Sequence, residues 1–219
     1  MARLPRLVVA GAAHCVVQQG LAGRPVFVDA QDREIYISAL LATAATEGCS
    51  LHAWALLDNE VRLVLTPPVA PALARLLQGV GRRYVSAHHR RHAGNGTLWS
   101  GRYRSAVLEP GAAVVDALLW VDGASAVPGW TSASHRSGGV ALPGLVDPAE
   151  IWFLGNTPFE REAAYGALLD AGLPLARQRW LRKAVMGGWA AGAEPFAAAV
   201  ATAVDRRARP RSPGRPRRS

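Results

Sequence analysis

Residues 51–66, LHAWALLDNEVRLVLT, limit the possible folds of this chain more than any other stretch. The segment predicts two short apolar strands, 51–57 and 60–66, joined by a tight turn. Successive side chains of a strand point to opposite faces, so Glu60 and Arg62 share one face of an otherwise apolar strand. They are either a solvated ion pair at a strand end, which would stabilise little, or residues placed there for a function.

The rest of the pattern predicts an α+β fold, in which an antiparallel sheet is backed by helices. Asp29 is a suitable N-cap for the first helix, and Gly48 is a suitable stop. Further strands are expected over 4–10, 14–19 and 103–108, and helices over 30–47, 70–92 and 112–121.

The composition changes after residue 128, which suggests three parts. Residues 1–128 would form the main domain. Residues 129–205 begin with an irregular connector and continue as a small helical extension. Residues 206–219 contain mainly Pro, Arg, Ser and Gly, and we expect a disordered basic tail because they are too polar to fold alone. The helices of the extension are predicted over 158–171, 175–186 and 195–203.

The net charge of +9 and the pI of about 10.9 favour a polyanionic partner. The tail supplies seven of the 25 basic residues, which leaves 18 basic against 16 acidic residues in 1–205. Cys15 and Cys49 are too few for a disulfide scaffold, so a reducing cytosol is the simpler interpretation. No apolar run approaches the length of a membrane span, so we expect a cytoplasmic, nucleoid-associated protein without a membrane partner.

Three segments, ARLPRLVVAGAAHCVVQQG, LHAWALLDNEVRLVLTPP and GTLWSGRYRS, resemble the REP-associated tyrosine transposases, which are bacterial relatives of the single-tyrosine HUH transposases. The resemblance implies a ferredoxin-like fold and a recognition of hairpin DNA. In that family a His-hydrophobic-His strand and a helical asparagine hold Mg or Mn, and a tyrosine one turn before the asparagine attacks a phosphodiester.

This sequence departs from the family at all four chemical positions. Glu60 and Arg62 stand where the two histidines would be, Trp120 replaces the tyrosine, and Ala124 replaces the asparagine. An indole cannot attack phosphorus, and alanine offers no ligand atom. The resemblance therefore implies lost catalysis, with no metal and no cofactor. An active tyrosine transposase or nickase is the alternative, and it would need another nucleophile.

Other residues of the same types are expected to be structural. Tyr84 and Tyr103 occupy places where the family tends to have aromatic residues, which favours packing over catalysis. His14 and His52 resemble ordinary family positions outside the metal centre, and a lone strand histidine is more often hydrogen-bonded structure than a ligand.

The expected partner is hairpin or single-stranded DNA, with an RNA hairpin as an alternative, and the resemblance leaves both a monomer and a homodimer open. We hypothesise that Arg62, oriented by Glu60, places a fixed positive charge near the family's metal position. Trp120 could stack on an unpaired base, although core packing is favoured. The predicted DNA contacts are Arg62, Arg82, Arg83, Arg90, Arg91, Arg102, Arg104, Arg215, Arg217 and Arg218.

Overall fold

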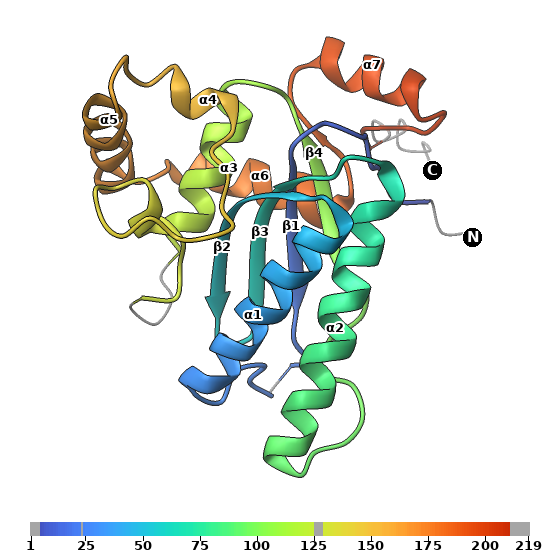
Figure 1. Cartoon of the computed structure of the whole chain (residues 1–219). Helices are drawn as coiled ribbons and strands as arrows, with labels where there is room; N and C mark the ends of the chain where they lie inside the picture. Colours follow the sequence, from blue (N-terminus) through green and yellow to red (C-terminus); the bar gives the residue numbers. More distant parts are fainter. Residues whose placement is uncertain (1–4, 23, 125–128, 211–219) are drawn as a thin grey trace, which may run out of the picture.

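A five-stranded sheet with helices on both faces forms the body of the protein (Figure 1), in a computed structural model that describes residues 5–22, 24–124 and 129–210. The first six elements alternate as β-α-β-β-α-β, and helices dominate the rest of the chain. In chain order the strands and α-helices are β1 (His14–Gln19), α1 (Ala30–Glu47), β2 (Ser50–Leu57), β3 (Glu60–Thr66), α2 (Ala70–His92), β4 (Arg104–Leu108), α3 (Ala112–Asp122), α4 (Ala149–Trp152), α5 (Pro158–Ala171), α6 (Leu175–Gly187), β5 (Ala190–Ala191) and α7 (Glu194–Ala203).

The strand order β2-β3-β1-β4-β5 gives the ferredoxin-like arrangement that the resemblance implies. The first four strands pair antiparallel, as the sequence predicts. The fifth strand pairs parallel with β4, so the sheet is mixed. The predicted fold class, α+β with helices backing the sheet, is therefore confirmed, with one short parallel strand added at its edge.

The ends of α1 follow from the residues that the sequence singles out. The Asp29 carboxylate accepts a hydrogen bond from the backbone N–H of Asp32, which satisfies one of the free donors of the first turn. Gly48 ends the helix with φ 65°, a left-handed conformation that glycine adopts without steric cost.

The sheet separates two apolar layers, one on each of its faces. The layer beneath α1 and α2 receives Val61, Leu63 and Leu65 from β3. The opposite layer, beneath α3, α5 and α6, receives Val64 of the same strand. Since side chains alternate along a strand, Glu60 and Arg62 face this second layer together with Val64.

The C-terminal helices pack onto the sheet instead of standing apart from it. Leu181 and Val185 of α6 are fully buried in the same apolar layer as Val17 of β1. Helix α5 adds Tyr165 to that layer. Helix α7 packs Ala197 and other apolar side chains against the edge of the sheet that β5 forms.

The irregular segment after residue 128 is anchored by a buried ion pair that the sequence analysis did not identify. The Arg136 side chain is 1% exposed, and its Nη1 donates to Asp122 Oδ2 at 3.2 Å. Tyr165 donates its hydroxyl to the same Oδ2 at 2.7 Å, and Arg136 Nε donates to Asp147 Oδ1 at 2.6 Å. Burial raises the pKa of Asp122, although Arg136 favours its charged form.

The predicted strand over residues 4–10 is wrong for its described part, residues 5–10, which form no strand. Strand β1 already pairs with β3 on one side and with β4 on the other, so no edge remains for a hairpin partner. Leu7 is buried instead in the small cluster beside α7.

The predicted disorder of the tail is wrong for its first residues. Ala208 is 2% exposed and accepts a hydrogen bond from the backbone N–H of Ala190, and Arg209 forms an ion pair with Glu194. The buried Ala208 side chain, its backbone hydrogen bond and the Arg209 ion pair together dock residues 206–210 against β5 and α7. The predicted contacts Arg215, Arg217 and Arg218 lie outside the described residues.

Candidate nucleic-acid interface

Glu60 and Arg62 form a sheltered ion pair on the face of β3 that looks toward α3. Arg62 Nε donates to Glu60 Oε1 at 2.7 Å, and the two side chains are 14% and 12% exposed. They are therefore not the solvated pair at a strand end that the local pattern alone would suggest. The geometry agrees with the hypothesis that Glu60 orients Arg62.

Trp120 completes this cluster from helix α3. The Arg62 guanidinium lies over the indole ring, 4.1 Å from its centroid, and Nη1 donates to the Trp120 carbonyl oxygen at 3.3 Å. Trp120 is 5% exposed and packs in the layer beneath α3 and α6. The indole serves as core and as a platform for the arginine, and its burial leaves no face for an unpaired base.

Two more polar side chains hold Glu60 in place. Arg182 of α6 donates to both carboxylate oxygens at 3.3 Å, and Gln19 of β1 donates to Oε2 at 3.2 Å. Burial raises the pKa of Glu60, but the hydrogen bonds and charges of Arg62 and Arg182 outweigh it and hold that pKa below its usual value. The carboxylate is therefore charged and fully engaged at neutral pH.

Ala124 does not belong to the helix that carries Trp120. Helix α3 ends at Asp122, where the N–H of Gly123 bonds back to the Leu119 carbonyl. The one-turn relation expected between positions 120 and 124 is consequently lost, since it requires a continuous helix. The half-buried Ala124 methyl packs against the apolar layer instead.

The residues of this cluster do not fit the Mg or Mn site that the family resemblance implies. A divalent ion needs several oxygen or nitrogen ligands, and the cluster offers the single carboxylate of Glu60. Both oxygens of that carboxylate already accept bonds from guanidinium groups, whose charge would repel a cation.

The four tyrosines of the chain are all buried, so each hydroxyl is kept from a phosphodiester at the surface. Tyr84 is 0% exposed and donates its hydroxyl to the Val26 carbonyl, and burial raises its pKa. Tyr103 is 6% exposed beneath the Arg6 guanidinium, which lies 4.0 Å from its ring centroid. Tyr36 and Tyr165 are at 0%.

The strand histidines serve structure. His14 is completely buried, with Nδ1 2.8 Å from the Ala12 carbonyl and Nε2 accepting the Val9 N–H at 3.2 Å. His52 bridges the Val146 carbonyl at 2.6 Å and the Thr66 hydroxyl at 2.8 Å. Neither ring has a nitrogen left for a metal.

The arginines predicted to contact DNA fall into different surroundings. On α2, Arg82, Arg83 and Arg90 are exposed, and Arg83 donates to the Thr43 hydroxyl at 2.9 Å. Arg91 is different because its guanidinium is held by the carboxylates of Asp29 and Asp32. That engagement removes Arg91 from the set of free cations.

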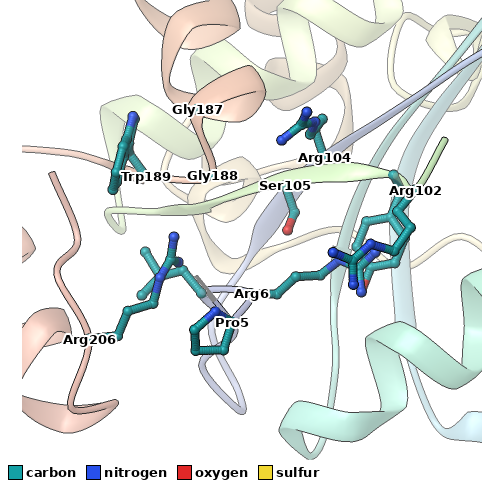
Figure 2. A pocket seen from close by; sticks show the side chains of 11 residues that line it. Pro5, Arg6, Arg102, Arg104, Ser105, Gly187, Gly188, Trp189 and Arg206 are labelled. Atoms are coloured by element: carbon teal, nitrogen blue, oxygen red, sulfur yellow. The ribbon is translucent and has the colours of Figure 1, made fainter. Parts of the chain in front are cut away.

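Arg102 and Arg104 line a basic cavity with a volume of about 230 Å³ (Figure 2). Arg206 from the start of the tail approaches from the other side, beside the indole of Trp189, and Arg6 also lines the wall (Figure 2). A second hollow of about 100 Å³ shares Arg102 and Arg104. The guanidinium groups that line this cavity make it positively charged, which favours the entry of an anion.

Arg206 is the residue of this cavity that most needs a partner. Its Nε and Nη1 are buried and have no hydrogen-bond partner among the described residues. Burial, reinforced by the charge of neighbouring Arg207, lowers the pKa of Arg206. Arg182, Trp189 and Arg206 could not be predicted as site residues, because no sequence pattern connects them to β3 or β4 and only the folded chain brings them there.

The strand order and the two helical layers define a ferredoxin-like α+β protein. Within that class the chain has the fold of a REP-associated tyrosine transposase. It is similar to a solved structure of such a transposase bound to a REP hairpin, with a TM-score of 0.53 and 10% identity, over 68% of this chain and 93% of that one.

A crystal structure of a candidate transposase from Deinococcus radiodurans R1 is 23% identical, with a TM-score of 0.38 over 50% of this chain and 88% of that one. A TM-score this low does not define a common fold. No protein-family model matches the sequence, and a comparison with curated proteins finds no match either. Among the described residues, every helix is too short or too polar to cross a membrane.

Proposed function

We propose that this protein binds hairpin or single-stranded DNA through an arginine-rich surface and does not cut it. The observation that carries the proposal is the cavity lined by Arg102, Arg104 and Arg206, in which buried guanidinium nitrogens lack a partner. Guanidinium groups make bidentate contacts with phosphate, which is the repeating anion of nucleic acids. The solved structure with this fold is bound to a REP hairpin, which supports the same class of ligand here.

The sheet extends this basic surface from the cavity toward Arg62. Val17 of β1 pairs with Arg62 on one side and with Arg104 on the other, so the two arginines lie on the same face. Two strand spacings separate the backbones of these two residues by about 10 Å. Exposed Arg102 lines the same hollow as Arg104, and half-buried Arg182 shares the Glu60 carboxylate with Arg62.

The Glu60–Arg62–Trp120 cluster supports binding without cleavage. A family reaction would need a tyrosine hydroxyl and a bound metal at this place. The cluster provides an indole and a guanidinium instead, and the tyrosines of the chain are buried elsewhere. Arg62 can neutralise a phosphate charge but cannot accept or deliver the groups that cleavage requires.

This function requires no cofactor, and a protein of this kind would be found with the nucleoid. The tail residues Arg215, Arg217 and Arg218 would add further phosphate contacts. Arg91 is excluded from the proposed contacts because two carboxylates, Asp29 and Asp32, hold it. Arg62 differs because it shares the single carboxylate of Glu60 with Arg182, which leaves a net positive charge there.

Fluorescence anisotropy of a labelled DNA hairpin with a single-stranded flank tests the proposal. We expect tighter binding to this hairpin than to a blunt duplex or to an RNA hairpin, and weaker binding as salt rises. Arg104→Ala should lower the slope of log K against log salt by about one, as expected for one lost phosphate contact. Arg161→Ala, on distant helix α5, is the matched control. Equal affinity for all three nucleic acids, or an unchanged slope in Arg104→Ala, would contradict the proposal.

A further inference from the structure

Three metal-ligating side chains meet where the start of α1 lies beside the end of α2. Asp32 belongs to the first turn of α1, and His88 and His92 belong to the last turns of α2. One ligand atom of each lies within 4.8 Å of the other two. The two histidines are four residues apart, so they share a helix face, and their ring centroids are 4.5 Å apart.

His88 is 7% exposed and is buried against the ring of Tyr84, with 5.8 Å between ring centroids. Neither Nδ1 nor Nε2 of the His88 ring, however, has a hydrogen-bond partner among the described residues. A buried polar group without a partner costs about 1–3 kcal/mol. Burial also lowers the pKa of His88, so the ring is neutral and carries a free lone pair at neutral pH.

Asp32 supplies a charged oxygen to the same point. Its carboxylate is completely buried, and Oδ2 lies 2.9 Å from both His92 Nε2 and the Val28 N–H. Arg91 occupies the other oxygen, Oδ1, and also pairs with Asp29. Two carboxylates against one guanidinium leave a net negative charge beside the histidines, which favours a cation.

We propose that Asp32, His88 and His92 bind one divalent transition-metal ion of the zinc type. Two imidazoles and one carboxylate are a donor set that Zn²⁺ accepts, with water in the remaining position. Because Nε2 of His92 donates its proton to the Asp32 carboxylate, binding first moves that proton to Nδ1 or releases it to solvent, and the freed lone pair of Nε2 then coordinates the ion. Asp32 Oδ1 stays with Arg91.

This site is separate from the Glu60–Arg62–Trp120 cluster. The α1 and α2 helices cover the other face of the sheet (Figure 1), so the ion would take no part in contacts made at Arg62 or Arg104. Its effect would be to tie the start of α1 to the end of α2. The proposal therefore stands or fails independently of the DNA contacts proposed at Arg62 and Arg104.

Titration of chelator-treated, full-length protein with Zn²⁺ tests the site, with Co²⁺ absorption as a spectroscopic readout of the ligand set. We expect one ion per chain, a higher Tm with Zn²⁺, and visible Co²⁺ bands. His92→Gln and His88→Phe should each weaken Zn²⁺ binding by about a hundredfold or more, since even groups behind the ligands contribute ten- to a hundredfold. His89→Gln changes the neighbouring histidine and is the control that should leave binding unchanged.

Circular dichroism before titration establishes that each variant is folded, and half-exposed His92 allows a substitution with little loss of core packing. A wild-type protein that binds no Zn²⁺ at micromolar concentrations would overturn the proposal. Binding that survives both His88→Phe and His92→Gln, or that is lost in His89→Gln, would overturn it as well.

Discussion

The guanidinium of Arg62 lies over the indole ring of Trp120, with Cζ 4.1 Å from the ring centroid. The two residues are 58 positions apart in the sequence, yet they meet because β3 faces α3. Both stand at positions where the family resemblance implies catalytic groups. The contact joins the two side chains into one packed cluster.

A double-mutant cycle should detect this contact in the free energy of unfolding. A sheltered cation–π pair contributes about 1–2 kcal/mol. We expect Arg62→Met and Trp120→Leu to show a coupling energy of about 1 kcal/mol in urea unfolding. A cycle between Arg62 and distant Leu73 of α2 is the control, and it should show additivity. Additive losses at Arg62 and Trp120 would mean that the contact does not stabilise the protein.

Replacing Arg62 should also weaken DNA binding if the residue holds a phosphate. Arg62→Ala removes the charge and should weaken hairpin binding about tenfold or more, since a charge-assisted hydrogen bond contributes about 1.5–3 kcal/mol. Arg62→Lys should retain part of the affinity, because it keeps the charge but loses the planar fork. Anisotropy at fixed salt measures both. Wild-type affinity in folded Arg62→Ala would exclude a phosphate contact at this position.

Removing Arg136 should destabilise the fold strongly. Its partner Asp122 is completely buried, so Arg136→Ala leaves an unpaired carboxylate in the apolar layer, at a cost of about 3–5 kcal/mol. Arg82→Ala, which removes an exposed arginine of α2, is the matched control and should lower the free energy of unfolding by less than about 0.5 kcal/mol. Chemical unfolding compares the two. Similar small losses in both variants would show that the pair does not anchor the connector.

Acid should destabilise the protein partly through His14. Burial lowers the pKa of His14 from 6.5 to about 4, so between these values the unfolded chain binds a proton that the folded chain does not. Stability therefore falls as the pH drops from 6.5 toward 4, by about 1.4 kcal/mol per pH unit for this one group. We expect His14→Gln to be less stable at pH 7 but to lose less stability between pH 7 and pH 5. Parallel pH profiles of the two proteins would contradict this assignment.

Much of the fold could be predicted from local patterns. Asp29 and Gly48 mark the ends of α1, and alternation along residues 60–66 places Glu60 and Arg62 on one face. These features depend on a few neighbouring residues, so a sequence displays them directly. The expected strand over 4–10 failed because its apolar pattern says nothing about whether a sheet edge is free.

The site was less predictable because it depends on contacts between distant segments. Arg102 and Arg104 stood out as basic residues beside a strand, but their cavity needs Trp189 and Arg206 from the far end of the chain. Arg91 looked like a surface cation at a helix end until the fold placed it against Asp29 and Asp32. Sequence shows charge, whereas only the fold shows whether the charge is already neutralised.

The most direct test of the account is to incubate the protein with an end-labelled DNA hairpin in Mg²⁺ or Mn²⁺ and to separate the products under denaturing conditions. The same mixture in a native gel establishes that the hairpin is bound. The account predicts a shifted complex in the native gel, with intact DNA and no covalent protein–DNA adduct in the denaturing gel. A metal-dependent adduct, mapped to any tyrosine of the chain, would contradict it.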